Sequence, residues 1–134
     1  MRKAIPVLAY LYLVLIIAAS LGRFMLGVFP KGIKNSDKYG HAFAYMVFVV
    51  IWGLYFLYKN QEPVVQKRFF SSGLKALIFA VLFGIIMEVA QWGLTSYRQF
   101  DVLDMLANTF GALIGMLIFN ILPKYSGFIK KSEL

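Results

Sequence analysis

The amino-acid sequence predicts an all-α membrane protein with four transmembrane helices, and composition is the first reason. Of the 134 residues, 60% are hydrophobic and 15% are charged, and the mean hydropathy is +0.72. Soluble domains are about half apolar and about a quarter charged. The second reason is that the hydrophobic residues gather in four stretches, each close to the roughly 20 residues that a helix needs to cross a bilayer. We expect a single domain over residues 1–134.

The predicted spans follow one another with short connections. A basic start, Met1 to Lys3, precedes the first apolar run as in a signal peptide. That run is longer than a signal peptide needs and further runs follow it, so we expect an uncleaved helix. The predicted spans are residues 5–24, 39–58, 73–94 and 102–122.

The connections contain recognisable boundary signals. Good N-cap residues at 35–37 predict that the second helix begins near Lys38. The middle connection, residues 59–72, includes a basic and aromatic segment at 66–70 that we expect at the inner membrane interface. The connection at residues 95–100 is so short that helices three and four should form a tight antiparallel hairpin.

The distribution of basic residues predicts the orientation. Nine of the 14 Lys and Arg residues lie on the side of the amino end, the middle connection and the tail, and five lie on the other side. This bias predicts that both termini lie in the cytoplasm. The net charge of +8 comes from residues that flank the spans, which indicates contact with anionic headgroups rather than nucleic acid. Without cysteine, disulfide and thiol chemistry are excluded.

Polar residues interrupt the last two apolar stretches at spacings of three, four and seven. Such spacing stacks them on one face of each helix. On the second helix, Lys38, His41 and Tyr45 lie at the matching depth, toward the outer end of the bundle. Ionisable groups at membrane depth are costly, so their convergence predicts a buried polar site. The residues on the third and fourth helices are Glu88, Gln91, Arg98, Asp101, Asp104 and Asn108.

Several of these residues also have a purely structural interpretation. Asp101 is placed to cap the fourth helix, and Asn108 can bond across helices. Arg98 can reach lipid phosphates or pair with an aspartate. Tyr45 and Trp92 fit an interfacial aromatic belt.

Gly111 and Gly115 form a small-x-x-x-small pattern that lets another helix approach closely, and they also offer a surface for a homo-oligomer.

Glu88 and Asp104 resist the structural interpretation best. Each lies inside an apolar run, where a carboxylate must be protonated or have a cation nearby. The candidate cations are Arg98, His41 and Lys38, and a buried structural ion-pair network is the alternative. A metal ion held by His41, Glu88 and Asp104 fits the residue types. No paired motif such as H-E-x-x-H supports it, so we expect neither a metal nor another cofactor.

The polar pattern resembles that of the VanZ-like family of small bacterial membrane proteins. One departure is that the family usually has Phe directly after the histidine, whereas Ala42 stands there and Phe43 follows. The resemblance implies a multi-pass protein of the cell envelope, located in the bacterial inner membrane, and one relative is associated with teicoplanin resistance. It assigns no individual roles. The matching strings are Asp37-Lys38-x-x-His41-x-x-x-Tyr45 and Glu88-x-x-Gln91-x(6)-Arg98-x-x-Asp101-x-x-Asp104-x-x-x-Asn108-x-x-Gly111-x-x-x-Gly115.

Three functions remain open. In the first, Arg98 and Lys38, with Lys31 and Lys34 of the outer loop, bind a lipid-linked phosphate and so alter how a glycopeptide meets its target.

In the second, an intramembrane hydrolase or transferase uses Glu88 or His41 as base, with Asp104 as partner and Arg98 as charge stabiliser. In the third, the same acidic and histidine groups relay protons in a small transporter.

Overall fold

The computed structural model describes residues 4–22, 36–96 and 99–125 and forms four long helices. All four are long and apolar enough to cross a membrane, which confirms the predicted fold class. Their bounds are α1 Ala4–Leu21, α2 Ser36–Lys59, α3 Val65–Leu94 and α4 Val102–Tyr125.

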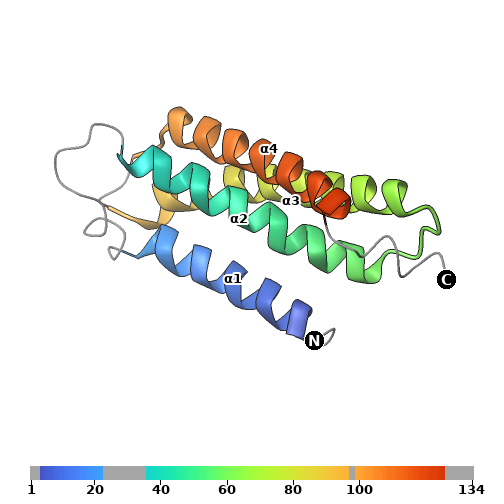
Figure 1. The fold of residues 1–134 in the computed structure, drawn as a ribbon. Helices are drawn as coiled ribbons and strands as arrows, with labels where there is room; N and C mark the ends of the chain where they lie inside the picture. The colour runs from blue at the N-terminus through green and yellow to red at the C-terminus, as the bar shows by residue number, and fades with distance from the viewer. Residues whose placement is uncertain (1–3, 23–35, 97–98, 126–134) are drawn as a thin grey trace.

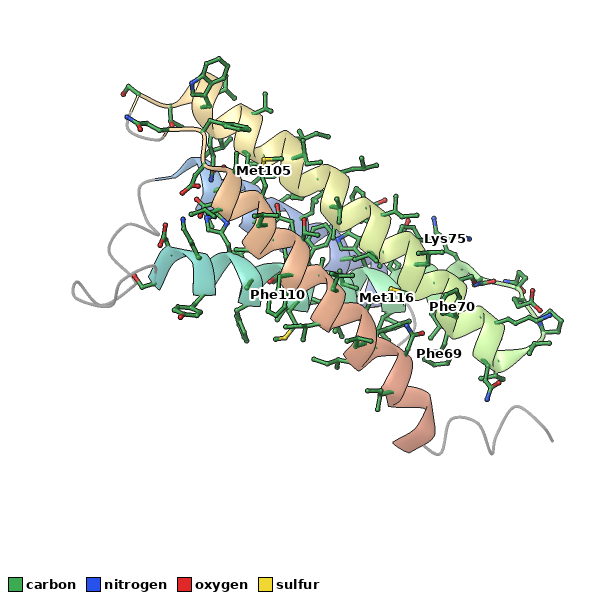
Figure 2. The ribbon with its side chains drawn as sticks, turned by 90° about the horizontal axis from the view of Figure 1, so that it is seen from above. Phe69, Phe70, Lys75, Met105, Phe110 and Met116 are labelled. Carbon is green, nitrogen blue, oxygen red and sulfur yellow. The ribbon has the colours of Figure 1, made fainter. Side chains whose placement is uncertain are left out.

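The helices run antiparallel to their neighbours in sequence, with α2 at the centre (Figure 1). Helix α2 packs against α1, α3 and α4, while α3 and α4 lie side by side as the predicted hairpin (Figure 2). Helix α1 begins and α4 ends at the same end of the bundle (Figure 1). We call this the terminal end, and the end where α2 and α4 begin the polar end. Which end faces the cytoplasm stays a prediction.

Helix α3 begins earlier than the sequence predicted. It starts at Val65, so the segment at 66–70 forms its first turns, and the prediction of a loop through Ser72 was wrong. Pro63 lies just before the helix, where the missing amide hydrogen removes no helical bond. Phe69 (Figure 2) packs on Phe119 of α4, with ring centroids 5.4 Å apart. This buried contact favours helix at residues whose basic neighbours suggested a surface loop.

Aromatic rings fill the middle of the bundle between α2 and α3. Phe48 is fully buried and stacks on Phe83 at a centroid distance of 5.4 Å. Trp52 meets Phe79 edge to face at 4.6 Å. These large, tightly packed rings hold α2 and α3 in register. Residues near the ends of the two helices are therefore held at fixed positions relative to one another.

Helices α2 and α4 approach closely along a glycine face. A Cβ atom added to Gly111 would overlap the backbone of Ala42, and one added to Gly115 would meet the carbonyl oxygen of Met46. The predicted role of these glycines in close helix packing is therefore confirmed. Because α2 already covers this face, the glycines do not leave it open to a second copy of the chain, and a homo-oligomer stays a prediction that needs another surface.

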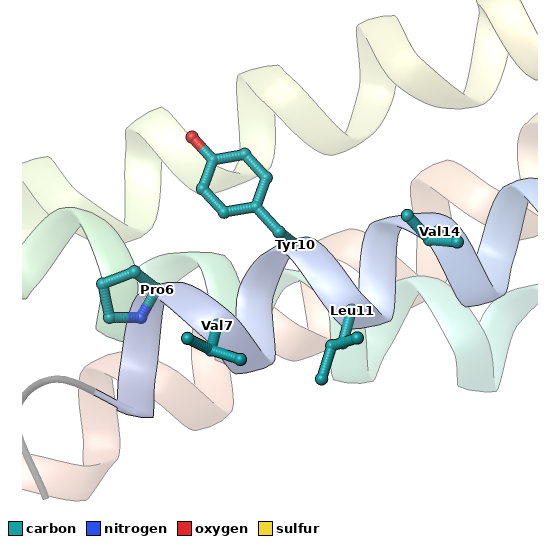
Figure 3. Close-up of a pocket in the computed structure, with 5 residues that line it drawn as sticks. All are labelled: Pro6, Val7, Tyr10, Leu11 and Val14. Atoms are coloured by element: carbon teal, nitrogen blue, oxygen red, sulfur yellow. The ribbon is translucent and has the colours of Figure 1, made fainter.

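Helix α1 is the most peripheral of the four. Ala9 and Ile16, two turns apart, are its buried residues, and the opposite face is exposed. A shallow apolar hollow lies on its first half (Figure 3), away from the polar end. In a bilayer this face would contact acyl chains, so the hollow is no candidate for chemistry. Its lining residues are Pro6, Val7, Tyr10, Leu11 and Val14.

Candidate functional site

Polar side chains from three helices meet at the polar end. The start of α2, the end of α3 and the start of α4 lie together there (Figure 1). Most of these groups are largely buried, although the surrounding helices are apolar. We call Lys38, His41, Glu88, Asp101, Asp104 and Asn108 the polar cluster.

Lys38 joins α2 to the start of α4. Its Nζ donates to Asp101 Oδ2 at 2.7 Å and to Asp104 Oδ1 at 2.8 Å. These are short, charge-assisted hydrogen bonds. The Asp104 side chain is buried at 8% exposure, whereas that of Lys38 is 19% exposed and only partly shielded from solvent. Asp104 thus has the cation partner that a buried carboxylate requires.

Asp101 combines a cap with an ion pair. Its Oδ1 accepts a hydrogen bond from the backbone N–H of Leu103 at 2.8 Å, which confirms the predicted cap of α4. Its other carboxylate oxygen accepts from Lys38. The hydrogen bond from Lys38 lowers the pKa of Asp101 below its ordinary value. The cap and the ion pair together fix where α4 begins relative to α2.

The contacts of His41 define its tautomer. Its Nδ1 lies 3.1 Å from Asn108 Oδ1, and an amide oxygen only accepts, so Nδ1 carries the hydrogen. In the neutral ring, Nε2 then holds the lone pair. Nε2 faces Asp104 Oδ2 at 3.6 Å. The cross-helix bond predicted for Asn108 is confirmed, and its effect is to aim the second ring nitrogen at a carboxylate.

Glu88 reaches the same place from α3. It is 1% exposed and lies two helical turns before the end of that helix. A ring nitrogen of His41 and one carboxylate oxygen each from Glu88 and Asp104 lie within 4.8 Å of one another. The three residues come from three different helices and could together hold a metal ion or exchange a proton.

Tyr45 lies one turn farther into the bundle. It is 2% exposed and stacks on Phe48 at 5.8 Å, so its assignment to an interfacial belt was wrong. Within the described part of the chain, its hydroxyl has no hydrogen-bond partner. That hydroxyl lies within electrostatic range of Glu88. Trp92, by contrast, is 64% exposed, as expected of a belt residue.

The protein matches the family model VanZ/LLP1 over residues 7–123. The chain belongs to this family. Family membership and four membrane-spanning helices make it a multi-pass membrane protein of the cell envelope. The match includes every residue of the polar cluster.

Two curated relatives of this VanZ/LLP1 protein carry the same name. It is 30% identical over 115 residues to a phospho-N-acetylmuramoyl-pentapeptide-transferase of Streptococcus pyogenes serotype M18, and 29% identical to the one of serotype M6. Each match covers 83% of this chain and 32% of the relative, so the chain spans about a third of their length. No solved structure matches the chain significantly.

Not every predicted site residue joins the polar cluster in this family member. Gln91 is 2% exposed, and its Nε2 donates to the carbonyl oxygen of Ser20 at 3.0 Å, which ties α1 to α3. Arg98, Lys31 and Lys34 lie outside the described residues, so their predicted roles stay predictions.

Two positions beside the site were not predicted from the sequence. Ser20 contributes only its backbone, which no side-chain pattern signals. Gly84 lies between α2 and α4, where an added Cβ would be 3.2 Å from Tyr45 Cε1 and 3.4 Å from Asn108 Cβ. Its place one turn before Glu88 was the available signal.

Proposed function

We propose that this protein lies in the bacterial inner membrane and that its polar end binds a lipid-linked, phosphate-bearing component of the cell envelope. The observation that carries the proposal is the Lys38 ammonium, held between Asp101 and Asp104 at 2.7 and 2.8 Å at the end of an apolar bundle. A ligand with a hydrocarbon chain and a charged headgroup fits a site where apolar helix surface meets fixed charges.

The geometry of Lys38 supports a phosphate headgroup. An ammonium has three donors, and two of them make short bonds to carboxylates. The contact to Asp37 is long, at 3.5 Å, so one donor is well placed for a phosphate oxygen. The carboxylates orient the ammonium, and its exposed fraction of 19% leaves it accessible. Arg98, Lys31 and Lys34, which lie close in sequence to the ends of these helices, would add positive charge.

The named relatives support the same class of ligand. Their name describes a transferase of a phospho-sugar linked to a peptide. Because this chain matches a third of their length, the shared part is proposed to contribute recognition of the phosphate-bearing group. Binding of that kind would also change how a glycopeptide such as teicoplanin meets its lipid-linked target.

A matched pair of lipids tests the binding. Undecaprenyl phosphate and undecaprenol differ only in the phosphate, and each can be added to the purified protein in nanodiscs. We expect the phosphate to bind at least tenfold more tightly and to raise the melting temperature. Lys38→Gln should remove this preference, whereas Lys75→Gln, on an exposed face of α3 (Figure 2), should keep it. Equal binding of both lipids would contradict the proposal.

Susceptibility to teicoplanin tests the consequence in cells. We expect the inhibitory concentration to rise when the protein is expressed, and to rise less with Lys38→Gln at equal membrane abundance. An unchanged concentration would limit the function to lipid binding.

Hydrolysis or group transfer at the same phosphate is the second candidate. It is favoured by the closeness of His41, Glu88 and Asp104, which could act as base and partner. Phosphate release from undecaprenyl pyrophosphate measures it. Release should depend on Glu88, so Glu88→Gln should abolish it while Glu62→Gln, at the terminal end, should not.

A further inference from the structure

We propose that His41, Glu88 and Asp104 form a binding site for one divalent transition-metal ion, with Zn²⁺ as the preferred ion and Mn²⁺ as the alternative. This inference goes beyond the proposed lipid binding and does not depend on it. The sequence did not favour a metal, because the ligands are not paired in a local motif. The fold brings them together from three helices instead.

The geometry of the three side chains fits a metal centre. One ligand atom from each lies within 4.8 Å of the others. Ligands about 2.0–2.2 Å from a tetrahedral metal lie roughly 3.5 Å apart, so small side-chain rotations complete the site. One imidazole and two carboxylates are donors that suit Zn²⁺ and Mn²⁺. Three protein ligands also leave a coordination position for water or substrate.

The tautomer of His41 prepares it to act as a ligand. Its Nδ1–H donates to Asn108 Oδ1 at 3.1 Å, so the lone pair of Nε2 faces Asp104 Oδ2 at 3.6 Å. A metal ion placed between these two atoms would be bound by both of them. A hydrogen bond from the second ring nitrogen to an acceptor is the usual outer-shell support of a metal-bound histidine.

Asp104 divides its two oxygens between separate partners. Oδ1 accepts from Lys38, and Oδ2 faces the histidine. Lys38 therefore orients this ligand through the oxygen that does not face the histidine. A dication bound at this point would be attracted by the carboxylates of both Glu88 and Asp104.

Tyr45 provides an independent indication of a ligand. Its side chain is buried, its hydroxyl has no hydrogen-bond partner among the described residues, and that hydroxyl lies within electrostatic range of Glu88. A buried hydroxyl without a partner is costly. A water molecule bound to the metal would supply that partner.

Metal stoichiometry tests the site directly. The purified full chain is stripped with a chelator, dialysed against Zn²⁺ or Mn²⁺, and analysed by mass spectrometry for metal and by calorimetry for affinity. We expect one Zn²⁺ per chain. Glu88→Gln and Asp104→Asn should each weaken binding at least tenfold. Glu62→Gln and Asp37→Asn, the same substitutions outside the triad, should leave it unchanged. Equal affinity in all four variants would overturn the proposal.

A measurement on the wild-type protein guards against variants that fail to fold. X-ray absorption at the zinc edge should show one imidazole nitrogen and otherwise oxygen donors. Asn108→Ala, which removes the acceptor for His41 Nδ1, should weaken affinity by roughly 10–100-fold and keep one metal per chain. A zinc spectrum without imidazole, or less than a tenth of an equivalent of metal, would overturn the site.

Discussion

The two ends of the bundle carry polar networks of different kinds. At the terminal end, Asn60 Nδ2 donates to the Arg68 carbonyl and to Ser71 and Ser72 hydroxyls, partners 8 to 12 residues away. At the polar end, the bonds from Lys38 and His41 to Asp101, Asp104 and Asn108 join residues 63 to 67 positions apart. The first network is neutral and closes one loop, whereas the second is charged and exists only when α2 and α4 are assembled.

This difference separates structural polarity from functional polarity. At the terminal end, neutral hydrogen bonds from Asn60 connect the loop after α2 to α3. Buried charges add a desolvation cost, and apolar side chains of similar volume often stabilise a fold as well. The charged cluster inside the membrane bundle is therefore the place where we propose that a ligand binds.

The largest expected effect comes from removing the buried carboxylate of the polar end. Asp104→Ala leaves the ammonium of Lys38 without its most buried partner, and we expect a loss of about 3 kcal/mol of stability. Asn60→Ala removes neutral bonds and should cost about 1 kcal/mol. Thermal unfolding of the two variants in the same detergent measures the difference. Equal losses would mean that the two networks do not differ in kind.

The next effect concerns the glycines in the two halves. A Cβ on Gly111 would overlap the rigid backbone of Ala42, whereas a Cβ on Gly53 would meet the Phe119 ring at 2.9 Å, and a ring can move. We expect Gly111→Ala to cost roughly 3 kcal/mol and Gly53→Ala roughly 1 kcal/mol.

Gly93→Ala is the control for both glycine variants, because nothing lies within 4 Å of the added Cβ. It should be neutral or slightly stabilising, since Ala favours helix. Melting temperatures of the three variants measure the order. A loss at Gly53 as large as that at Gly111 would show that side-chain and backbone contacts are equally rigid here.

The sequence predicts those features that depend on local pattern. Four spans follow from composition, the Asp101 cap follows from its position before α4, and the close approach at Gly111 follows from its spacing to Gly115. The meeting of polar groups at one end also follows, because antiparallel helices that each cross a membrane bring residues of the same depth to the same end of the bundle.

Features that depend on the rotation of one helix against another could not be predicted. The sequence offered Lys38 as one partner among several, and only the register of α2 on α4 places its ammonium between two aspartates. Gln91 bonds a backbone carbonyl on α1, which leaves no signal in side-chain patterns. Tyrosine is a residue type that is common in interfacial belts, and Tyr45 is buried only because α2 lies at the centre of the bundle.

The smallest expected effect is a pH dependence that belongs to the polar end alone. The hydrogen bond from Lys38 lowers the pKa of Asp101 in the folded protein, so this bond stabilises the fold above the ordinary carboxylate pKa of about 3.9. The stabilisation is lost as the pH falls through the lowered pKa. Because the Asp101 side chain is 40% exposed, the gain is at most about 1 kcal/mol.

Asp101→Asn isolates that contribution, because Asn still provides an oxygen to cap α4. The variant should melt a few degrees below the wild-type protein at pH 7, and the gap should close as the pH falls below the lowered pKa. Asp37→Asn is the control, since that carboxylate is 57% exposed and lies 3.5 Å from the ammonium, so its gap should stay near zero throughout. A gap for Asp101→Asn that is constant with pH would show that the Lys38 bond contributes no charge-dependent stability, and that the polar end is held, like the terminal end, by neutral contacts.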